Sequence, residues 1–234
     1  RFQESVIEEL RRKESGSSAD VIELHAKKHG DTLITLAELA KLTALSVDEV
    51  KEDVKELEEQ ELLAVFEMRK DTYIWHMDSI REAQQTLVRA LEDYEKKYPY
   101  RYGMKKAEIQ TMYFQKIKPN VFDRIVEFFV ERGCIRRAEE FLCTPEFEVK
   151  KDGTYQKVAE NFLNVFEKAG YDFVRYSEID MKGVSRDMAD DILNILLQEG
   201  KVGRVPEEMY TRAEYLEQAK EKRKAHMADE PLIK

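Results

Sequence analysis

The sequence is poor in cysteine, glycine and proline, and it has no long apolar run. Two cysteines among 234 residues exclude a disulfide framework and a four-thiolate zinc site, which indicates a reducing compartment such as the cytoplasm. Nine glycines and five prolines are too few for a low-complexity linker or a sheet-rich sandwich with frequent tight turns. Charged residues interrupt every apolar run well short of the roughly 20 residues that a bilayer requires. We expect a mainly helical, soluble protein without a membrane partner.

Motifs for nucleotides, metals and catalysis are also missing. The sequence contains neither a G-x-x-x-x-G-K-[ST] phosphate loop nor a G-x-G-x-x-G turn, so neither route to nucleotide binding is predicted. His25 and His29 lie four residues apart, but no glutamate stands between them as in the H-E-x-x-H zinc motif. Cys134 and Cys143 flank a predicted hairpin and are interpreted as a reduced structural pair. We expect this chain to be no enzyme and to hold no cofactor or metal.

The ends of the sequence suggest an excised piece of a longer protein. It begins with Arg1 and has no signal-peptide pattern, and it stops at Pro231-Leu232-Ile233-Lys234 as a new apolar stretch begins. At roughly 150 residues per domain, its length alone predicts one or two domains.

An internal repeat of about seventy residues raises that number. Residues 57–63, 129–135 and 196–202 look alike, and each is predicted to close a helix and open a strand. Glu61, Gly133 and Gly200 align in them, and glycine suits the left-handed cap that ends a helix. Each junction is followed by two short predicted strands around a polar tip. These strands are residues 63–67 with 73–76, 135–137 with 141–144, and 202–205 with 209–211.

The first repeat has the best helix signals. Thr35 with Glu38, and Ser46 with Glu49, fit the capping box, in which each side chain satisfies a free backbone amide of the other residue. Two helices are therefore predicted to begin at Thr35 and Ser46, after an earlier helix at about residues 19–29. Three helices followed by a two-stranded wing are the winged-helix plan.

The later repeats follow the same plan. In the second, a helical stripe begins near Ser79, and a last helix follows Asn120, a plausible N-cap. In the third, the second helix is predicted at residues 177–181, and Ser185 is predicted to cap the last helix. Residues 213–227 are typical of the first helix of a fourth copy.

The predicted fold is mainly α with small β-hairpins, of the α+β class, and consists of tandem winged-helix domains in an elongated arrangement. A connecting segment spans residues 1–18, and winged helices span residues 19–78, 79–150 and 151–212. Residues 213–234 would form the first helix of a truncated fourth domain. Each copy is near the lower size limit for an independent core, so neighbouring copies are expected to share apolar surface.

Charge argues against nucleic-acid reading by the first copy. A winged helix that binds DNA lays its third helix in the major groove, and that helix needs Lys and Arg. Between Ser46 and Glu61, only Lys51 and Lys55 oppose eight acidic residues, and such a helix would repel phosphates. In the third copy, Arg186 is likewise followed by acidic residues. Both helices are interpreted as surfaces for packing or for partners.

Residues 79–150 alone carry a net positive charge, with 14 basic and 12 acidic side chains in a chain of net charge -9. Between Lys96 and Lys118, seven cations stand with one acid, Glu108, and tyrosines lie among them. Such a pattern can hold a phosphate backbone and stack on bases. The alternative is that the tyrosines pack against the neighbouring repeat and the lysines are a solvated face. The candidate RNA-binding residues are Arg101, Lys105, Lys106, Lys116 and Lys118 and, in the third copy, Arg175, Lys182 and Arg186.

The chain resembles the C-terminal region of the bacterial selenocysteine-specific elongation factor, SelB. The run Tyr98-Pro-Tyr-Arg-Tyr-Gly-Met-Lys-Lys-Ala-Glu-Ile109 is similar to the stretch that opens the family's second winged helix. His76 fits the same pattern, as do the third copy and the helix at residues 213–227. The resemblance spans roughly the whole chain.

The resemblance implies a cytoplasmic translation factor whose N-terminal part is a GTPase that uses GTP and magnesium and carries selenocysteyl-tRNA. Four tandem winged helices follow, and the last binds the hairpin of selenoprotein messenger RNA beside a recoded UGA. Because the sequence stops before the reading helix of a fourth copy, no residue of that motif can be carried over. The implied role is an arm between the GTPase body and the messenger-binding tip at the ribosome.

A second hypothesis is a tandem winged-helix scaffold for protein partners without nucleic acid, which the net acidity favours. The sequence leaves open the angles between copies, the oligomeric state and any direct RNA contact. It also leaves open whether the GTPase and messenger sites communicate through rigid packing or through hinges near Asp78, Lys151 and Arg212.

Overall fold

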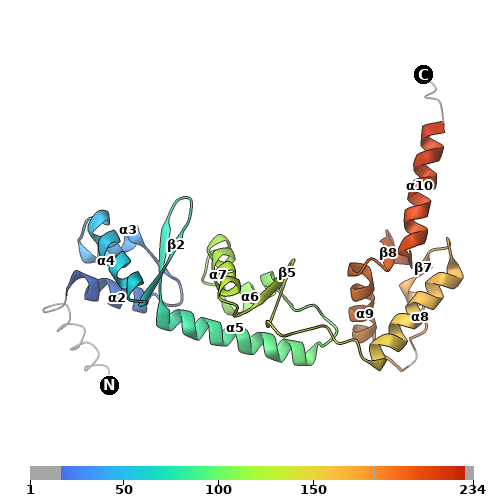
Figure 1. The fold of residues 1–234 in the computed structure, drawn as a ribbon, viewed down its shortest axis with the longest axis horizontal. Coiled ribbons are helices and arrows are strands. Elements are labelled where there is room, and N and C mark those ends of the chain that lie inside the picture. Colours follow the sequence, from blue (N-terminus) through green and yellow to red (C-terminus); the bar gives the residue numbers. More distant parts are fainter. Residues whose placement is uncertain (1–16, 182, 230–234) are drawn as a thin grey trace. The chain divides into compact units, whose positions relative to one another are not determined.

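One arrangement of elements occurs three times in the chain (Figure 1). The computed structural model describes residues 17–181 and 183–229, apart from the side chains of residues 225–229. Each copy runs helix, short strand, helix, helix, strand, strand. The three strands of each copy form an antiparallel sheet in which the last strand lies between the other two. The predicted α+β class, with winged-helix domains, is confirmed.

The first copy consists of α2 (Ser18–Lys28), β1 (Ile34–Thr35), α3 (Leu36–Thr43), α4 (Val47–Glu59), β2 (Leu63–Glu67) and β3 (Thr72–His76). Thr35 and Ser46 cap α3 and α4, each in a complete capping box, as predicted. A third box, formed by Ser17 with Asp20, starts α2. It has Asp at the position where the usual pattern has Glu or Gln.

The second copy consists of α5 (Met77–Lys97), β4 (Met104–Lys105), α6 (Lys106–Tyr113), α7 (Pro119–Glu131), β5 (Arg136–Ala138) and β6 (Phe141–Cys143). The prediction that Asn120 caps the last helix is wrong. Lys118 is the N-cap, in an extended conformation, and Pro119 is the first helical residue. Proline suits that position because its fixed φ is helical and its missing N–H would have no partner there.

The third copy consists of α8 (Gly153–Ala169), β7 (Val174–Arg175), η1 (Tyr176–Glu178), α9 (Arg186–Gln198), β8 (Val202–Val205) and β9 (Met209–Arg212), and α10 (Ala213–Asp229) follows. Ser185 caps α9 as predicted, by accepting a hydrogen bond from the Met188 N–H. The helix predicted at residues 177–181 is instead the single 3-10 turn η1, because Ile179 is extended and ends it. So short a segment cannot offset the cost of nucleating an α-helix.

The three junction residues share a left-handed backbone. The φ angles of Glu61, Gly133 and Gly200 are 56°, 69° and 66°, which confirms the predicted cap. The predicted hairpin strands are found with ends that differ by one residue at several places. Each sheet has a third strand of only two residues (β1, β4 and β7), too short for a recognisable pattern, and the second hairpin opens at Arg136 instead of Ile135.

The chain divides into two compact units. Unit 1 holds the described residues up to Tyr94 together with residues 103–146, and unit 2 holds residues 95–102 together with the described residues from Phe147 onwards. Unit 1 thus contains the first copy and most of the second. The boundaries predicted from the repeat follow a different criterion and stay predictions.

The two copies in unit 1 share one apolar core. Phe66 and Trp75, from the hairpin of the first copy, are buried against Phe128 and Phe129 of α7. The ring centroids of Phe66 and Phe128 lie 5.3 Å apart, and those of Trp75 and Phe129 lie 6.4 Å apart. The expected sharing of apolar surface is confirmed for these copies.

Unit 2 includes the segment between α5 and β4. Tyr100 and Tyr102 pack against the core of the third copy, which contains Phe162, Phe166 and Ile192. The Tyr100 hydroxyl lies 3.1 Å from a carboxylate oxygen of Asp152, the N-cap of α8. The chain re-enters unit 1 at Gly103, where φ is 141° and a side-chain carbon would overlap the Leu142 carbonyl.

Candidate nucleic-acid interface

The third helix and the wing of each copy are the surfaces on which a winged helix meets nucleic acid. On α4, Val50, Val54 and Leu57 face the core, while its acidic side chains are largely exposed. Only Lys51 and Lys55 are basic there, and the Lys55 ammonium lies 4.0 Å from Glu59. The geometry therefore places negative charge on the outer face of α4, where it would repel a phosphate backbone.

Lys105 and Lys106 lie at the junction of β4 and α6, and each contacts a carboxylate. The Lys105 ammonium lies 3.6 Å from Glu140, with both side chains more than half exposed. Lys106 is partly buried and donates a hydrogen bond to Asp123 on α7. Exposed pairs are worth at most about 1 kcal/mol. Lys105 can therefore exchange Glu140 for a phosphate more easily than Lys106 can leave Asp123.

Lys116 and Lys118 contact the first copy from the loop between α6 and α7. Lys116 pairs with Asp31 and holds the pKa of that carboxyl below its usual value. The Lys118 ammonium donates a 3.0 Å hydrogen bond to the Tyr73 hydroxyl, and this bond raises the pKa of Lys118. Both side chains therefore connect the two copies within unit 1.

Arg101 lies in unit 2 and is engaged twice. Its guanidinium donates a 2.7 Å hydrogen bond to Asp191 on α9 and lies 4.0 Å from the centroid of the Tyr98 ring. Burial raises the pKa of Asp191, and Arg101 opposes that rise. The contact ties the segment after α5 to the third helix of the next copy, so Arg101 has a structural role.

The candidates in the third copy lie apart along the chain. Arg175 in β7 is 3.8 Å from Glu207 at the tip of the wing. Lys182 lies outside the described residues. Arg186, the first residue of α9, is exposed, and its guanidinium lies 5.4 Å from the centroid of the Tyr176 ring.

Sequence reasoning missed Arg204, which joins Arg186 at a small cleft between α9 and the wing. The cleft has a volume of about 210 Å³ and also contains Asp190, Asn194 and Glu208. The Arg204 guanidinium lies 5.8 Å from the centroid of the Tyr210 ring. Among the described residues, neither arginine forms an ion pair, but the two carboxylates balance their charge. Arg204 pairs with Tyr210 across the hairpin. This pairing is the feature from which Arg204 could have been predicted as a candidate.

The four tyrosines of the basic segment have different surroundings. Tyr100 and Tyr102 pack in the core of unit 2, as the packing alternative predicts. Tyr98 lies beneath Arg101. Tyr113, at the end of α6, is 40% exposed and is the most exposed of the four.

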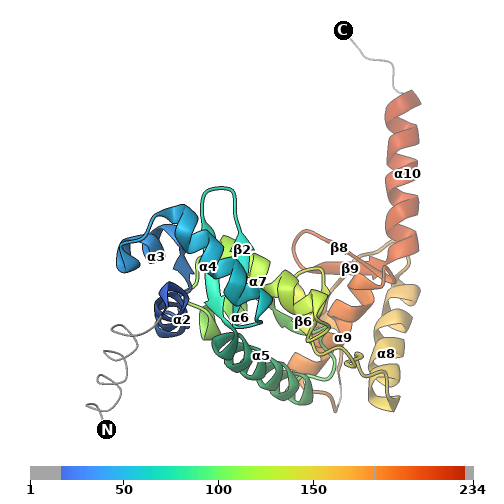
Figure 2. The same ribbon diagram turned by 60° about the vertical axis from the view of Figure 1, so that its left-hand side comes forward.

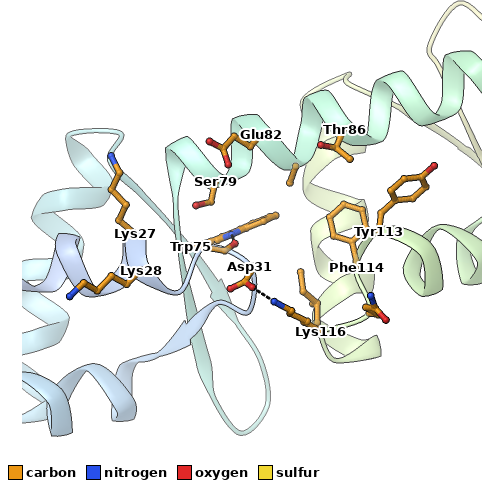
Figure 3. A pocket seen from close by; sticks show the side chains of 14 residues that line it. Lys27, Lys28, Asp31, Trp75, Ser79, Glu82, Thr86, Tyr113, Phe114 and Lys116 are labelled. Carbon is orange, nitrogen blue, oxygen red and sulfur yellow. Dashed lines mark hydrogen bonds and ion pairs between the residues drawn. The ribbon is translucent and has the colours of Figure 1, made fainter. Parts of the chain in front are cut away.

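Tyr113 borders a groove in unit 1 that has a volume of about 650 Å³ (Figure 3). The Trp75 and Phe114 side chains lie across this groove from each other, and α5 contributes Ser79, Glu82 and Thr86. Two lysines of the rim are neutralised, since Lys27 lies 2.7 Å from Asp78 and Lys116 pairs with Asp31. The groove therefore marks the joint between the two copies and shows no excess of positive charge.

Other features of the described residues are structural. Cys134 and Cys143 are free thiols, and burial raises the pKa of Cys134, which makes it a poor nucleophile. Among the side chains that the structure describes, in residues 17–181 and 183–224, no group of three is able to hold a metal ion. No helix within those ranges combines the length and apolarity that crossing a bilayer requires.

Residues 88–142 match a family model described as "Elongation factor SelB, winged helix", whose name designates the second winged-helix domain. The chain contains a SelB-like winged-helix region. This SelB-like region runs from the middle of α5 through β4, α6, α7 and β5 into β6. Five of the candidate RNA-binding residues lie within it, and Arg175 and Arg186 lie outside it.

One solved structure similar to the chain is the mRNA-binding domain of elongation factor SelB from E. coli in complex with SECIS RNA. It is 18% identical in sequence and covers 55% of this chain and 97% of that one, with a TM-score of 0.41. No curated protein matches the chain.

Proposed function

We propose that this chain is the winged-helix arm of a SelB-like, selenocysteine-specific translation elongation factor. In this role it joins a GTPase part, which carries selenocysteyl-tRNA, to a tip that binds the messenger hairpin at a recoded UGA on the ribosome. The match of residues 88–142 to the SelB winged-helix model carries the proposal. The acidic outer face of α4 supports it, because that copy is better suited to spacing than to gripping RNA.

The proposal places the chain in the cytoplasm and assigns GTP and magnesium to another part of the factor. Any direct contact between the arm and RNA would be made by the exposed cations of the SelB-like region. The first candidate is Lys105, whose ion pair with Glu140 is exposed and has a distance of 3.6 Å. Such contacts would be weak and sensitive to salt, since they rest on few charges.

Readthrough of UGA tests the role of the arm. The complete product of the gene would be expressed in a bacterium that lacks its own selenocysteine elongation factor, with a reporter in which a messenger hairpin follows an in-frame UGA. We expect readthrough that disappears when the hairpin sequence is scrambled or when residues 17–229 are deleted. If readthrough is undiminished after that deletion, the proposal is wrong.

RNA affinity of the 234-residue chain tests the second copy. We expect weak, salt-sensitive binding of an RNA hairpin that falls further in the variant Lys105→Ala with Lys106→Ala. The variant Lys27→Ala with Lys28→Ala removes the same charge from the first copy and should bind like the unaltered chain. Retained salt-sensitive binding in the Lys105 and Lys106 variant would exclude these residues from the interface.

A scaffold for protein partners is the second candidate function. The acidic side chains exposed on α4 favour it, because they could meet a basic protein surface. Absence of hairpin-dependent readthrough, together with a stable protein complex that Glu52→Lys with Glu56→Lys dissolves, would favour the scaffold over the translation factor.

A further inference from the structure

The second half of α10 carries the densest positive charge in the described part of unit 2. Four cations and one acid occupy residues 220–224, whereas Glu214 and Glu217 lie in the first half of the helix. Lys220 pairs with Glu217 at 2.6 Å, and the Lys222 ammonium lies 3.3 Å from the Tyr171 hydroxyl. Arg223 and Lys224 are exposed, and among the described residues they have no ion pair. They are therefore open to a partner that brings negative charge.

The base of α10 is fixed to the third copy. The ring centroids of Tyr215 and Tyr171 lie 5.3 Å apart, and the Tyr215 hydroxyl donates a 2.9 Å hydrogen bond to Glu167 on α8. Arg212, just before the helix, lies 3.2 Å from the same carboxylate. Leu216 packs so closely on Gly203 of β8 that a side-chain carbon there would overlap it. These contacts hold the helix against the unit that bears it.

Three of the four cations beyond this base share one side of the helix. Lys220 and Lys224 are four residues apart, and Arg223 is three from Lys220, so the three side chains are neighbours on the helix surface. In both ribbon views α10 extends away from α8 and β8 (Figures 1 and 2). The side chains of Lys220, Arg223 and Lys224 are exposed.

The composition of this part of α10 limits the kind of partner. Among residues 217–224, Ala219 is the only apolar residue, so this stretch has no apolar face to insert into a bilayer or into a hydrophobic groove. What it offers is charge, together with the planar guanidinium of Arg223, which can bind a phosphate through two hydrogen bonds. A polyanion with regularly spaced phosphates fits these properties.

We propose that Lys220, Arg223 and Lys224 of α10 bind the phosphate backbone of RNA. The choice of RNA rests on the proposed translation function, and the inference adds a contact outside the SelB-like region. Binding is independent of base sequence, because phosphates carry no sequence information. The helix thereby adds an electrostatic anchor to an otherwise acidic chain.

Fluorescence anisotropy of a labelled RNA hairpin of arbitrary sequence tests this site on the 234-residue chain. The variant Arg223→Gln with Lys224→Gln should weaken binding several-fold. It should also reduce the slope of log K against log salt concentration by about 2, roughly one for each lost phosphate contact. Arg223→Lys keeps the charge and should retain most of the affinity. Gln is a good helix former, and far-ultraviolet circular dichroism would confirm that α10 persists.

The matched control is Lys157→Gln with Lys168→Gln, which removes two exposed cations from α8 in the same unit. A control loss as large as that of the α10 variant would show a general effect of net charge and overturn the site. Equal affinity for polyglutamate would instead identify an acidic protein as the partner. Neither outcome bears on UGA readthrough, which tests the proposed function separately.

Discussion

At the scale of single residues, the three junctions adopt the same left-handed backbone conformation, but its conformational energy differs between glycine and glutamate. Gly133 and Gly200 adopt the left-handed conformation freely, whereas Glu61 adopts it with φ at 56°. A residue with a Cβ pays roughly 1–2 kcal/mol in this region, because that atom approaches the following carbonyl oxygen. Glu61 is exposed, so no packing at its side chain explains the residue.

Replacing Glu61 by glycine should therefore stabilise unit 1 by about 1 kcal/mol. The measurement is urea unfolding of the chain followed by fluorescence of Trp75, the one tryptophan in the sequence. Glu61→Ala is the control, since it removes the same charge but keeps the Cβ, and it should leave the midpoint nearly unchanged. Equal gains from both variants would attribute the effect to charge and refute the strain.

At the scale of elements, Asp152 shows how one cap joins two parts of unit 2. Its carboxylate accepts hydrogen bonds from the backbone N–H groups of Thr154 and Tyr155 at the start of α8. It also lies 2.9 Å from the Lys150 ammonium and accepts from the Tyr100 hydroxyl. The Tyr155 N–H above all, then Lys150 and Tyr100, lower the pKa of Asp152 from 3.8 to about 2.

This lowered pKa predicts an acid-sensitive helix start. The unfolded chain takes up the proton at higher pH than the folded one. The stabilisation is therefore complete above pH 3.8 and is lost as the pH falls toward about 2. Asp152→Asn can still cap α8 but cannot titrate, so we expect unit 2 to lose less stability over that interval. Circular dichroism melts at several pH values would measure this, with Glu160→Gln on the same helix as control. An unchanged acid profile in Asp152→Asn would exclude this carboxyl as the cause.

Local patterns account for the elements that the sequence predicts well. The boxes at Thr35 and Ser46 and the junction glycines depend on residues within a few positions of each other, so they can be recognised in the sequence. The partners of the basic segment cannot, because Lys116 meets Asp31 and Arg101 meets Asp191 across 85 and 90 positions of the chain. Along the sequence, only one acidic residue lies among these cations, whereas in the folded chain several acidic residues from distant positions contact them.

The sequence also does not show which domain core the tyrosines of the basic segment enter. Tyr100 and Tyr102 follow the first helix of the second copy in sequence, but they pack in the core of the third. Periodicity identifies an apolar or aromatic side chain as buried without showing which core receives it. Arg204 was missed for a related reason, since its neighbour Arg186 is distant in sequence.

At the scale of the whole molecule, the compact units answer part of the question about hinges. The first and second copies share the core around Trp75, and Lys27 pairs with Asp78 at their junction, so a hinge near Asp78 is not favoured. Near Arg212, α10 is held by Tyr171, Glu167 and Gly203. Within each unit, these contacts oppose bending at Asp78 and at Arg212.

A shared core also predicts how the chain unfolds. Trp75 belongs to the first copy, yet Phe129 of the second packs beside it, so the two copies should unfold in one transition. Phe129→Ala should cost about 3–5 kcal/mol and move the unfolding midpoint seen by Trp75 fluorescence. Phe166→Ala removes an equally buried ring from unit 2. It should move the transition seen by circular dichroism and leave the Trp75 signal in place. If Phe129→Ala leaves the midpoint seen by Trp75 fluorescence unchanged, the first copy folds alone. If Phe166→Ala shifts that midpoint, the two units unfold together.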